Sequence, residues 1–408
     1  MDTVESARAH MQSAVQALGS ESVQLRAAAD RTLAETLAAT RDQPPFRSSA
    51  MDGYAVRSAD LDGGRLTIVG QSAAGSAHEG TVNSGQAVRI FTGAPVPPGA
   101  DSVIPQEFTR RDGDQLDIDV SAKPARNIRQ AAIDFGAGDR LIEAGTRLNA
   151  RHIALLAAAG IASVKVRRVP RIALLATGTE IAAPGTPAGP YQIYDSVTFG
   201  LAAMIEAWGG QPVHAAPSPD NDEAVSAAIG AALAFADLGV IVGGASVGDF
   251  DIVKRALGQR GLKISVPKVA VRPGKPTWFG TLDGKPILGL PGNPAAAFVC
   301  AYLFLRPLLH AFLARSAASR LMPAVLDGNL GAGGDKESYW RARVRIAEDA
   351  RLMVRPFDHQ DTSLVSVFAA SNALIRTVAG AGPAASGAIV EVMLLDGPGG
   401  EAPGDASV

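Results

Sequence analysis

Cysteine is almost absent from this sequence of 408 residues, which contains Cys300 and no other. A single cysteine excludes an intramolecular disulfide and a Cys-x-x-Cys metal site, and it is weak evidence for a reducing compartment. Cys300 lies in the apolar run Ala295–Leu305. We therefore expect it to be a buried and inert core residue.

Net charge and long hydrophobic runs are scarce as well. The formal net charge is −2, which excludes the broad basic field that nucleic-acid or anionic membrane binding would need. The run Ala295–Leu305 is shorter than the roughly 20 apolar residues that span a bilayer. The acidic start Met1–Glu5 has no apolar signal-peptide segment. We expect a cytoplasmic protein with no nucleic-acid and no membrane partner.

Several catalytic signatures are missing too. The six histidines are scattered and no pair has metal-ligand spacing. A Ser/His/Asp triad built from distant residues stays open. No Gly-x-Gly-x-x-Gly follows the first strand of the α/β region, which disfavours a dinucleotide-binding dehydrogenase.

The composition and hydrophobic pattern change several times along the chain, and its length predicts more than one domain. Helical patterns are expected from residue 4 to a stop at Gly19, over Ala27–Ala39 and over Ala150–Ala159. The 44 glycines and 26 prolines indicate many turns. We predict a multi-domain α/β fold in these parts: a helical subdomain of 1–45 with 137–170, a β-rich insert domain of 46–136, a doubly wound, mostly parallel α/β domain of 171–320, a C-terminal small β-barrel domain of 321–396, and a disordered tail of 397–408.

Residues 171–320 alternate between apolar strands and helical patterns, which is typical of an open, mostly parallel sheet with helices on both faces. Ligands bind such sheets beyond the carboxyl ends of the strands. Three polar loops follow predicted strands: Thr177–Glu180, Gly243–Asp251 and Pro291–Pro294. We expect these three loops to lie at one edge of the sheet.

The loop after the strand ending at Val242 is rich in glycine and carries two aspartates. A strand, a glycine turn and a helix start together present backbone N–H groups to an anion. The aspartates would repel a bare phosphate, so a divalent cation between carboxylate and phosphate fits better. The alternative is that Asp249 merely caps the next helix. The residues concerned are Gly243, Gly244, Ser246, Gly248, Asp249 and Asp251.

Other polar stretches are ambiguous when taken singly. Lys268 and the stiff segment Arg272–Pro276 either present cations to a polyanion or form an ordinary surface turn. Asn293-Pro294 is also a normal helix start. In the β-rich part, the stretches Ser48–Ala55, Ile90–Pro95 and Asn127–Arg129 with Asp134 are either functional loops or turns.

Taken in order, these motifs resemble the molybdopterin molybdenumtransferases, a family that includes the E-domain of gephyrin. The resemblance covers nearly the whole chain, and five motifs in the right order are highly specific. They are Pro44–Phe46 with Ser49–Ala55, Arg89–Ala94 with Pro98–Asp101, Gly243–Asp249, Arg272–Pro276, and Gly289–Pro294.

The resemblance implies a homodimer whose members use Mg²⁺, adenylylated molybdopterin and molybdate, release AMP and leave molybdenum on the dithiolene. An upstream adenylyltransferase and acceptor molybdoenzymes would be further partners. The site would lie between the β domain of one subunit and the α/β domain of the other. By position, the resemblance makes these residues catalytic: Asp52, Thr92, Asp134, Glu180, Asp220 and Asp251. It also implies that Glu180, Asp249 and Asp251 are the Mg²⁺ ligands.

The remaining matched positions would bind substrate: Gly243, Gly244, Ser246, Gly248, Lys268, Arg272, Lys275, Pro291, Asn293 and Pro294. The chain departs from the family pattern at several places. Thr179 stands where the family usually has Asp, Ala132-Ile133 where it has Gly-Glu, Ala295-Ala296 where it has Val-Ser, and Ser48 where it has Asn. The missing carboxylates keep open a non-catalytic protein that binds or delivers molybdopterin or the finished cofactor. A scaffold role ranks below both.

Overall fold

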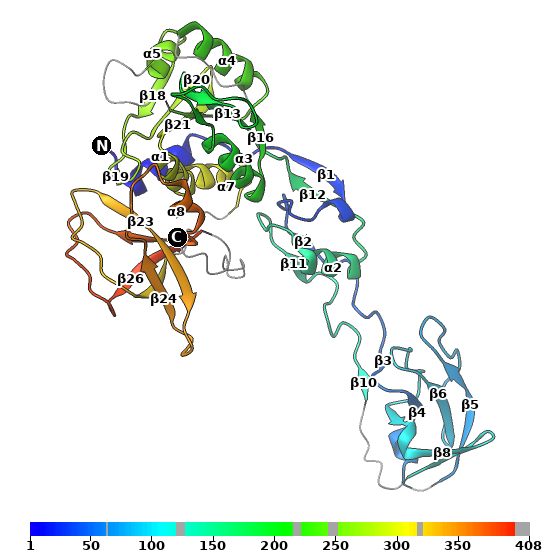
Figure 1. Ribbon diagram of the computed structural model, residues 1–408. Helices are drawn as coiled ribbons and strands as arrows, with labels where there is room; N and C mark the ends of the chain where they lie inside the picture. The colour runs from blue at the N-terminus through cyan, green and yellow to red at the C-terminus, as the bar shows by residue number, and fades with distance from the viewer. Residues whose placement is uncertain (63, 120–126, 215–221, 244–251, 316–320, 396–408) are drawn as a thin grey trace. The chain divides into compact units, whose positions relative to one another are not determined.

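The computed structural model describes residues 1–62, 64–119, 127–214, 222–243, 252–315 and 321–395 (Figure 1). These residues form two compact units. Unit 1 comprises Met1–Glu21, Asp30–Ala34 and Val166 onward, and unit 2 comprises Ser22–Ala29 and Glu35–Lys165. The predicted tail of 397–408 lies outside the described residues.

Unit 1 contains a six-stranded sheet in the order β16-β13-β17-β21-β20-β18. The first four strands run parallel, and β20 runs antiparallel to both of its neighbours, β21 and β18, which confirms the mostly parallel sheet. The strands are β13 (Arg171–Ala176), β16 (Gln211–His214), β17 (Leu238–Val242), β18 (Lys263–Val266), β20 (Trp278–Leu282) and β21 (Lys285–Leu290).

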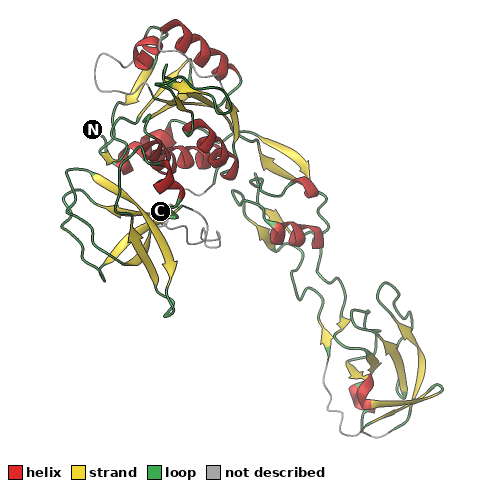
Figure 2. Ribbon diagram, viewed as in Figure 1, coloured by secondary structure: helices red, strands yellow, loops and turns green. Residues whose placement is uncertain are grey.

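Successive residues of the central strands enter different cores, because side chains alternate across a sheet. Leu174 packs into one apolar cluster and Leu175 into the other. Figure 2 shows helices on both faces, as a doubly wound domain requires. The helices are α1 (Val4–Ser13), α3 (Val197–Ala207), α4 (Asp222–Ala234), α5 (Ile252–Gly258), α6 (Pro294–Cys300) and α7 (Arg306–Phe312).

Helices α6 and α7 are joined by the π-helical turn η4 (Ala301–Leu305) into one helix of 19 residues. By length and composition this helix could cross a membrane, so the sequence argument from the shorter run Ala295–Leu305 was wrong about length. Pro307 ends the apolar run but not the helix, because it lies in the first turn of α7. The window is 78% buried, which is typical of a core helix. Cys300 is fully buried within it, as predicted.

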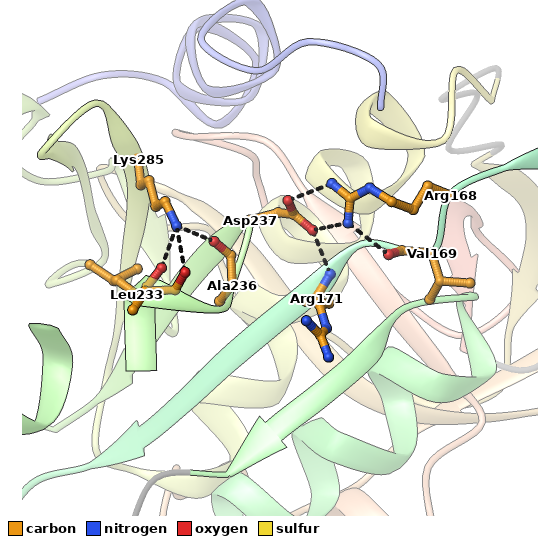
Figure 3. Close-up of polar contacts among 8 residues, drawn as sticks. Arg168, Val169, Arg171, Leu233, Ala236, Asp237 and Lys285 are labelled. Atoms are coloured by element: carbon orange, nitrogen blue, oxygen red, sulfur yellow. Dashed lines mark hydrogen bonds and ion pairs between the residues drawn. The ribbon is translucent and has the colours of Figure 1, made fainter. Parts of the chain in front are cut away.

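Polar contacts hold the C-terminal end of α4 and the start of β13 in place (Figure 3). The Lys285 ammonium donates to the carbonyls of Leu233 and Ala236 at the C-terminal end of α4. A cation is favourable there because the last carbonyls of a helix have no helical partner. The Asp237 carboxylate accepts from both terminal nitrogens of Arg168 and from the backbone N–H of Arg171.

The C-terminal part of unit 1 is a closed barrel of five strands, as predicted. Its strands are β22 (Met322–Leu326), β23 (Glu337–Ile346), β24 (Leu352–Pro356), β25 (Ala373–Thr377) and β26 (Ile389–Leu394), with α8 (Val365–Ala369) before β25. The additional pairing of β23 with β25 closes the ring. The short strand β19 (Val271–Arg272) pairs parallel with β23, so the barrel is tied directly to the Arg272 segment.

Unit 2 contains a six-stranded sheet in the order β7-β4-β6-β5-β9-β8, in agreement with the predicted β-rich texture. Its strands are β4 (Gly53–Val56), β5 (Leu66–Ser72), β6 (Gln86–Ile90), β7 (Ser102–Pro105), β8 (Thr109–Asp112) and β9 (Gln115–Ile118), with 3₁₀ turns η2 (Ser58–Asp60) and η3 (Gln106–Phe108). A separate pair joins β3 (Ser48–Ser49) to β10 (Ile128–Arg129).

The expected helix over Ala27–Ala39 is absent. In its place the chain forms the 3₁₀ turn η1 (Leu25–Ala27) and the short strand β2 (Leu37–Ala38), which pairs with β11 (Arg140–Ile142). Asp30 has a left-handed backbone and Leu33 is fully buried, so tertiary packing overrides the propensity of the alanines. Nearby, β1 (Ser20–Gln24) pairs with β12 (Ser163–Arg167).

The other two expected helices form, and the first is shorter than expected. Helix α1 ends at Ser13 rather than before Gly19, and Leu18 donates its backbone N–H to the Phe312 carbonyl. Helix α2 (Ala150–Ala158) forms as predicted. His152 completes a capping box with Asn149 at its start.

Candidate functional site

The three predicted loops begin at one edge of the parallel sheet, because β13, β17 and β21 are adjacent and run in the same direction. Of the loop after β17, only Gly243 is described. A side-chain carbon on Gly243 would lie 2.7 Å from the Thr177 carbonyl oxygen. A side-chain carbon on Gly292 would lie 3.5 Å from the Gly243 Cα atom. Gly243 has a φ of 88°, so both its conformation and its surroundings favour glycine.

The loop after β13 is held by a short parallel pair, β14 (Ile181–Ala182) with β15 (Ile193–Tyr194). The Gln192 side-chain amide donates to the Thr179 carbonyl at 3.1 Å, and the Ile193 N–H donates to the Glu180 carbonyl at 2.8 Å. These bonds leave the Glu180 side chain exposed. The next carboxylate, Asp195, is buried and accepts from the backbone and hydroxyl of Thr198 at the start of α3.

The predicted magnesium ligands are tested only in part. Glu180 is described, whereas Asp249 and Asp251 lie outside the described residues, as do Asp220, Gly244, Ser246 and Gly248. In the described part of the chain, no three His, Cys, Asp or Glu side chains are grouped to hold a metal ion. Mg²⁺ usually binds one or two carboxylates together with water and substrate phosphates. The exposed Glu180 carboxylate, in the loop beyond the carboxyl end of β13, fits the role of one such ligand.

A cavity of about 450 Å³ lies beside Arg272 and Lys275. Pro291 and Asn293 also line it, from the loop after β21. The barrel supplies further lining residues, including Asp335, Lys336, Ser338 and Thr362. The cavity therefore brings four predicted substrate-binding residues together. Lys268 and Pro294 do not line this cavity.

The loop that carries Arg272 and Lys275 packs against the Cys300 side chain. Gly274 has a φ of 122°, and a side-chain carbon there would lie 2.2 Å from the Cys300 sulfur. The Thr277 hydroxyl donates to that sulfur at 3.1 Å. Burial raises the pKa of the Cys300 thiol to about 12, so the thiol is neutral and serves as packing.

Asn293 differs from the ordinary helix start that its sequence context allows. It precedes Pro294 at the start of α6, but its side chain makes no capping bond. The Asn293 amide instead donates to the Thr362 hydroxyl at 2.7 Å, and the Ala295 N–H donates to the Thr362 carbonyl at 3.0 Å. Thr362 thus fixes the loop after β21 to the barrel.

Sequence reasoning missed the contribution of the barrel. Lys336 binds both carboxylate oxygens of Asp335, at 2.6 and 2.7 Å. The hydrogen bond from Lys336 holds the pKa of Asp335 below its ordinary value, and the charge of Lys275 lowers it further. A signal existed: a pair of opposite charges follows the glycine-rich stretch 328–334 and precedes a run of alternating arginine and apolar residues at 341–346.

In unit 2 the structure joins Asp52 to Thr92. One oxygen of the Asp52 carboxylate accepts from the Thr92 N–H at 2.7 Å and from its hydroxyl at 2.9 Å. These two bonds, aided by the positive charge of Arg89, lower the pKa of Asp52. The result is an exposed, ionised carboxylate in a fixed orientation.

Arg89 holds the strands on which this carboxylate depends. Its guanidinium lies over the rings of Tyr54 and Phe91, with 5.1 and 4.7 Å to the ring centres. It donates to the Gly53 carbonyl at 3.0 Å and to the Gln106 side chain at 2.7 Å. Arg89 therefore anchors the residue next to Asp52.

Asp134 lies elsewhere in unit 2. It lines a separate cavity of about 380 Å³, together with Phe135, Asp139, Arg140, Leu141 and Leu155. Asp52 and Thr92 do not line this cavity. Close to Asp134, Ala132 has a left-handed φ of 57° and Ile133 is 62% exposed.

Comparisons with known proteins agree with this arrangement. Residues 2–160 match the MoeA N-terminal region (domain I and II), 173–311 match a probable molybdopterin binding domain, and 323–395 match the MoeA C-terminal region (domain IV).

Named relatives and a solved structure match over most of their length. The molybdopterin molybdenumtransferase of Nostoc sp. is 39% identical over 78% of this chain and 76% of that protein. That of Haemophilus influenzae is 35% identical over 87% and 89%. The crystal structure of the molybdopterin biosynthesis MoeA protein of Pyrococcus horikoshii is 31% identical, covers 97% of this chain and 99% of that chain, and has a TM-score of 0.84. The chain belongs to the molybdopterin molybdenumtransferase family.

Proposed function

We propose that this protein is a transferase of molybdenum cofactor biosynthesis. It takes adenylylated molybdopterin and molybdate, cleaves the adenylate in the presence of Mg²⁺, releases AMP and leaves molybdenum on the dithiolene. The names of the relatives support the transfer of molybdenum to molybdopterin. Magnesium dependence, AMP release and action as a cytoplasmic homodimer are further parts of the proposal.

The cavity between the Arg272–Pro276 loop and the barrel carries this proposal. Arg272 and Lys275 line it from their loop, and Lys336 lines it from the barrel. Phosphate and molybdate oxygens are acceptors for guanidinium and ammonium groups. Cleavage of a phosphoanhydride needs positioning and charge neutralisation more than a nucleophilic side chain. A cavity lined by cations beside the strand-end loops suits that chemistry.

Carboxylates take a different part in the proposed reaction. Glu180 would bind Mg²⁺, which neutralises phosphate charge when bound. Asp52 is ionised and held by Thr92, so it would orient water or a cationic group. In the homodimer, Asp52, Thr92 and Asp134 would serve the substrate bound by the partner subunit.

One assay tests the proposal. The purified protein is given adenylylated molybdopterin, molybdate and Mg²⁺, and AMP is measured with time. We expect AMP release that depends on Mg²⁺ and falls strongly in Arg272→Ala. Arg345→Ala is the matched control, because Arg345 pairs with Asp327 in the barrel and does not line the cavity. Catalysis is refuted by tight binding of adenylylated molybdopterin without AMP above background.

That refuting result is also the one expected of the second candidate, a protein that binds or delivers molybdopterin or the finished cofactor without catalysis. Thr179 favours this candidate, because it is an exposed residue without charge beside Glu180. Loss of an outer carboxylate around a metal site typically costs about 10- to 100-fold in affinity or activity. Thr179→Asp should therefore raise Mg²⁺-dependent turnover if the protein is an enzyme, and leave a mere carrier unchanged.

A further inference from the structure

The cavity lining contains one carboxylate among its cations. Asp335 and Lys336 lie on the loop before β23 and face the same cavity as Arg272 and Lys275. A binding site for oxyanions gains nothing from a negative charge, because like charges repel. Asp335 must therefore do something other than bind the oxyanion.

The geometry of the Asp335–Lys336 ion pair indicates what Asp335 does. Both oxygens of Asp335 bind the Lys336 ammonium. The Lys336 side chain is 20% exposed, whereas that of Asp335 is 80% exposed. The ammonium is thus held in the wall while the carboxylate lies on its open side. Lys275 also acts electrostatically on Asp335.

Asp335 therefore occupies Lys336 in the way that an incoming oxyanion would. An ion pair with one exposed partner contributes little net stability, so an anion with more oxygens and more charge can displace the carboxylate. Neutralisation of Asp335 would leave the Lys336 ammonium free.

We propose that Asp335 is an internal counter-ion of the cavity, which competes with the tetrahedral oxyanion of the substrate for Lys336. The barrel thereby sets how tightly phosphoryl or molybdate oxygens are held and how readily they leave. This inference rests on the proposed function for the identity of the substrate, but the competition itself concerns any tetrahedral oxyanion.

The experiment is calorimetric titration of the full chain with inorganic phosphate and, separately, with molybdate. Asp335→Asn should bind one or both oxyanions about 3- to 10-fold more tightly, as removal of one competing charge near a partly exposed cation allows. The oxyanion whose affinity rises is the one that Lys336 serves. Lys336→Met should bind that oxyanion more weakly than the wild type does.

Asp349→Asn is the matched control. Asp349 pairs with Arg351 in the same barrel, changes the net charge equally and does not line the cavity. The inference is overturned if Asp335→Asn binds both oxyanions no more tightly than the wild type, or if Asp349→Asn tightens binding equally.

Failure of the inference and failure of the proposed function remain distinguishable. A protein that binds phosphate more tightly after Asp335→Asn but releases no AMP supports the counter-ion and refutes catalysis. A protein that releases AMP but has the same oxyanion affinity in Asp335→Asn and the wild type retains its function and refutes the counter-ion.

Discussion

The cavity beside Arg272 and the turn that holds Asp52 are opposite in charge and in construction. The cavity is lined by cations from a loop of the α/β domain and from the barrel, which are far apart in the sequence. The turn presents one carboxylate, fixed by the adjacent strands β4 and β6 of a single sheet. The first depends on the docking of two domains and suits anions. The second depends on local hydrogen bonds and suits a cation or a donor.

Gly274→Ala should have the largest effect, because it disrupts the packing of the Arg272–Pro276 loop against Cys300. A left-handed alanine costs about 1–2 kcal/mol, and overpacking against the Cys300 sulfur costs about 1–3 kcal/mol more. We expect a loss of about 2–5 kcal/mol in the free energy of unfolding of unit 1, with weakened phosphate binding. Denaturant unfolding and phosphate titration measure the two effects.

Gly284→Ala is the control for backbone strain alone. Gly284 also has a left-handed φ, of 77°, but a side-chain carbon there meets nothing within 4 Å. It should cost only the strain and leave phosphate binding intact. Equal losses in the two variants would show that Cys300 does not support the cation loop.

Asp52→Asn tests whether the two regions act separately. The amide oxygen of Asn can still accept both bonds from Thr92, so the fold should be kept while the charge is lost. Turnover in the AMP assay should fall about 100-fold, the usual size of a lost electrostatic contact in a reaction. The phosphate affinity of the cavity should not change. Calorimetry and the AMP assay together give both numbers.

Asp117→Asn is the matched control for Asp52→Asn, since Asp117 pairs with the exposed Arg65 in the same sheet. It should leave turnover unaffected. If Asp52→Asn weakened phosphate binding as much as turnover, the separation of the two regions would be wrong.

Ala132→Gly should have a smaller and favourable effect. Ala132 has a left-handed backbone at a position where the family usually has glycine, and its N–H donates to the Pro44 carbonyl. Relief of the strain, less the greater freedom of glycine in the unfolded chain, should stabilise by about 0.5–1 kcal/mol. A rise of about 2–4 °C per kcal/mol in the thermal midpoint is the measure.

Ala137→Gly provides the comparison, because Ala137 is exposed in the same loop region and has no left-handed φ. It should lower the midpoint. A lower midpoint in both variants would mean that Ala132 is not strained.

The sequence predicts the α/β domain well because its strands are apolar runs that end in polar loops, and parallel neighbours place those loops at one edge. Strands β13, β17 and β21 follow that pattern closely. The helix over Ala27–Ala39 fails because propensity carries no information on the pairing of β2 with β11.

The candidate site is predictable where its parts are motifs and not where they come from docking. Resemblance placed Asp52 and Thr92 among the catalytic residues, and the structure joins them by two hydrogen bonds. Asn293 instead meets Thr362, 69 residues along the chain, and nothing local in either segment indicates the other. Asp335 and Lys336 enter the cavity for the same reason.

Thr92→Val is the subtlest test of the local turn. The Thr92 backbone N–H is the main cause of the lowered pKa of Asp52, and the hydroxyl is the second. Valine removes the hydroxyl alone, so the pKa of Asp52 should rise part of the way to its ordinary value. Carboxyl NMR titration of the full chain, labelled at aspartate, measures it.

The sign of the pH effect follows from that direction. A carboxyl with a lowered folded pKa stabilises the fold above its unfolded pKa, near 3.9, and this contribution is lost as pH falls through the folded pKa. In Thr92→Val the contribution is smaller, and its loss on acidification is complete at a higher pH. The acid limb of turnover should move upward with it. Thr109→Val is the control, because the Thr109 hydroxyl donates to the Gln106 carbonyl and not to a carboxylate. An unchanged Asp52 titration in Thr92→Val would mean that the backbone N–H alone fixes this carboxylate, and the turn would then require no particular side chain at position 92.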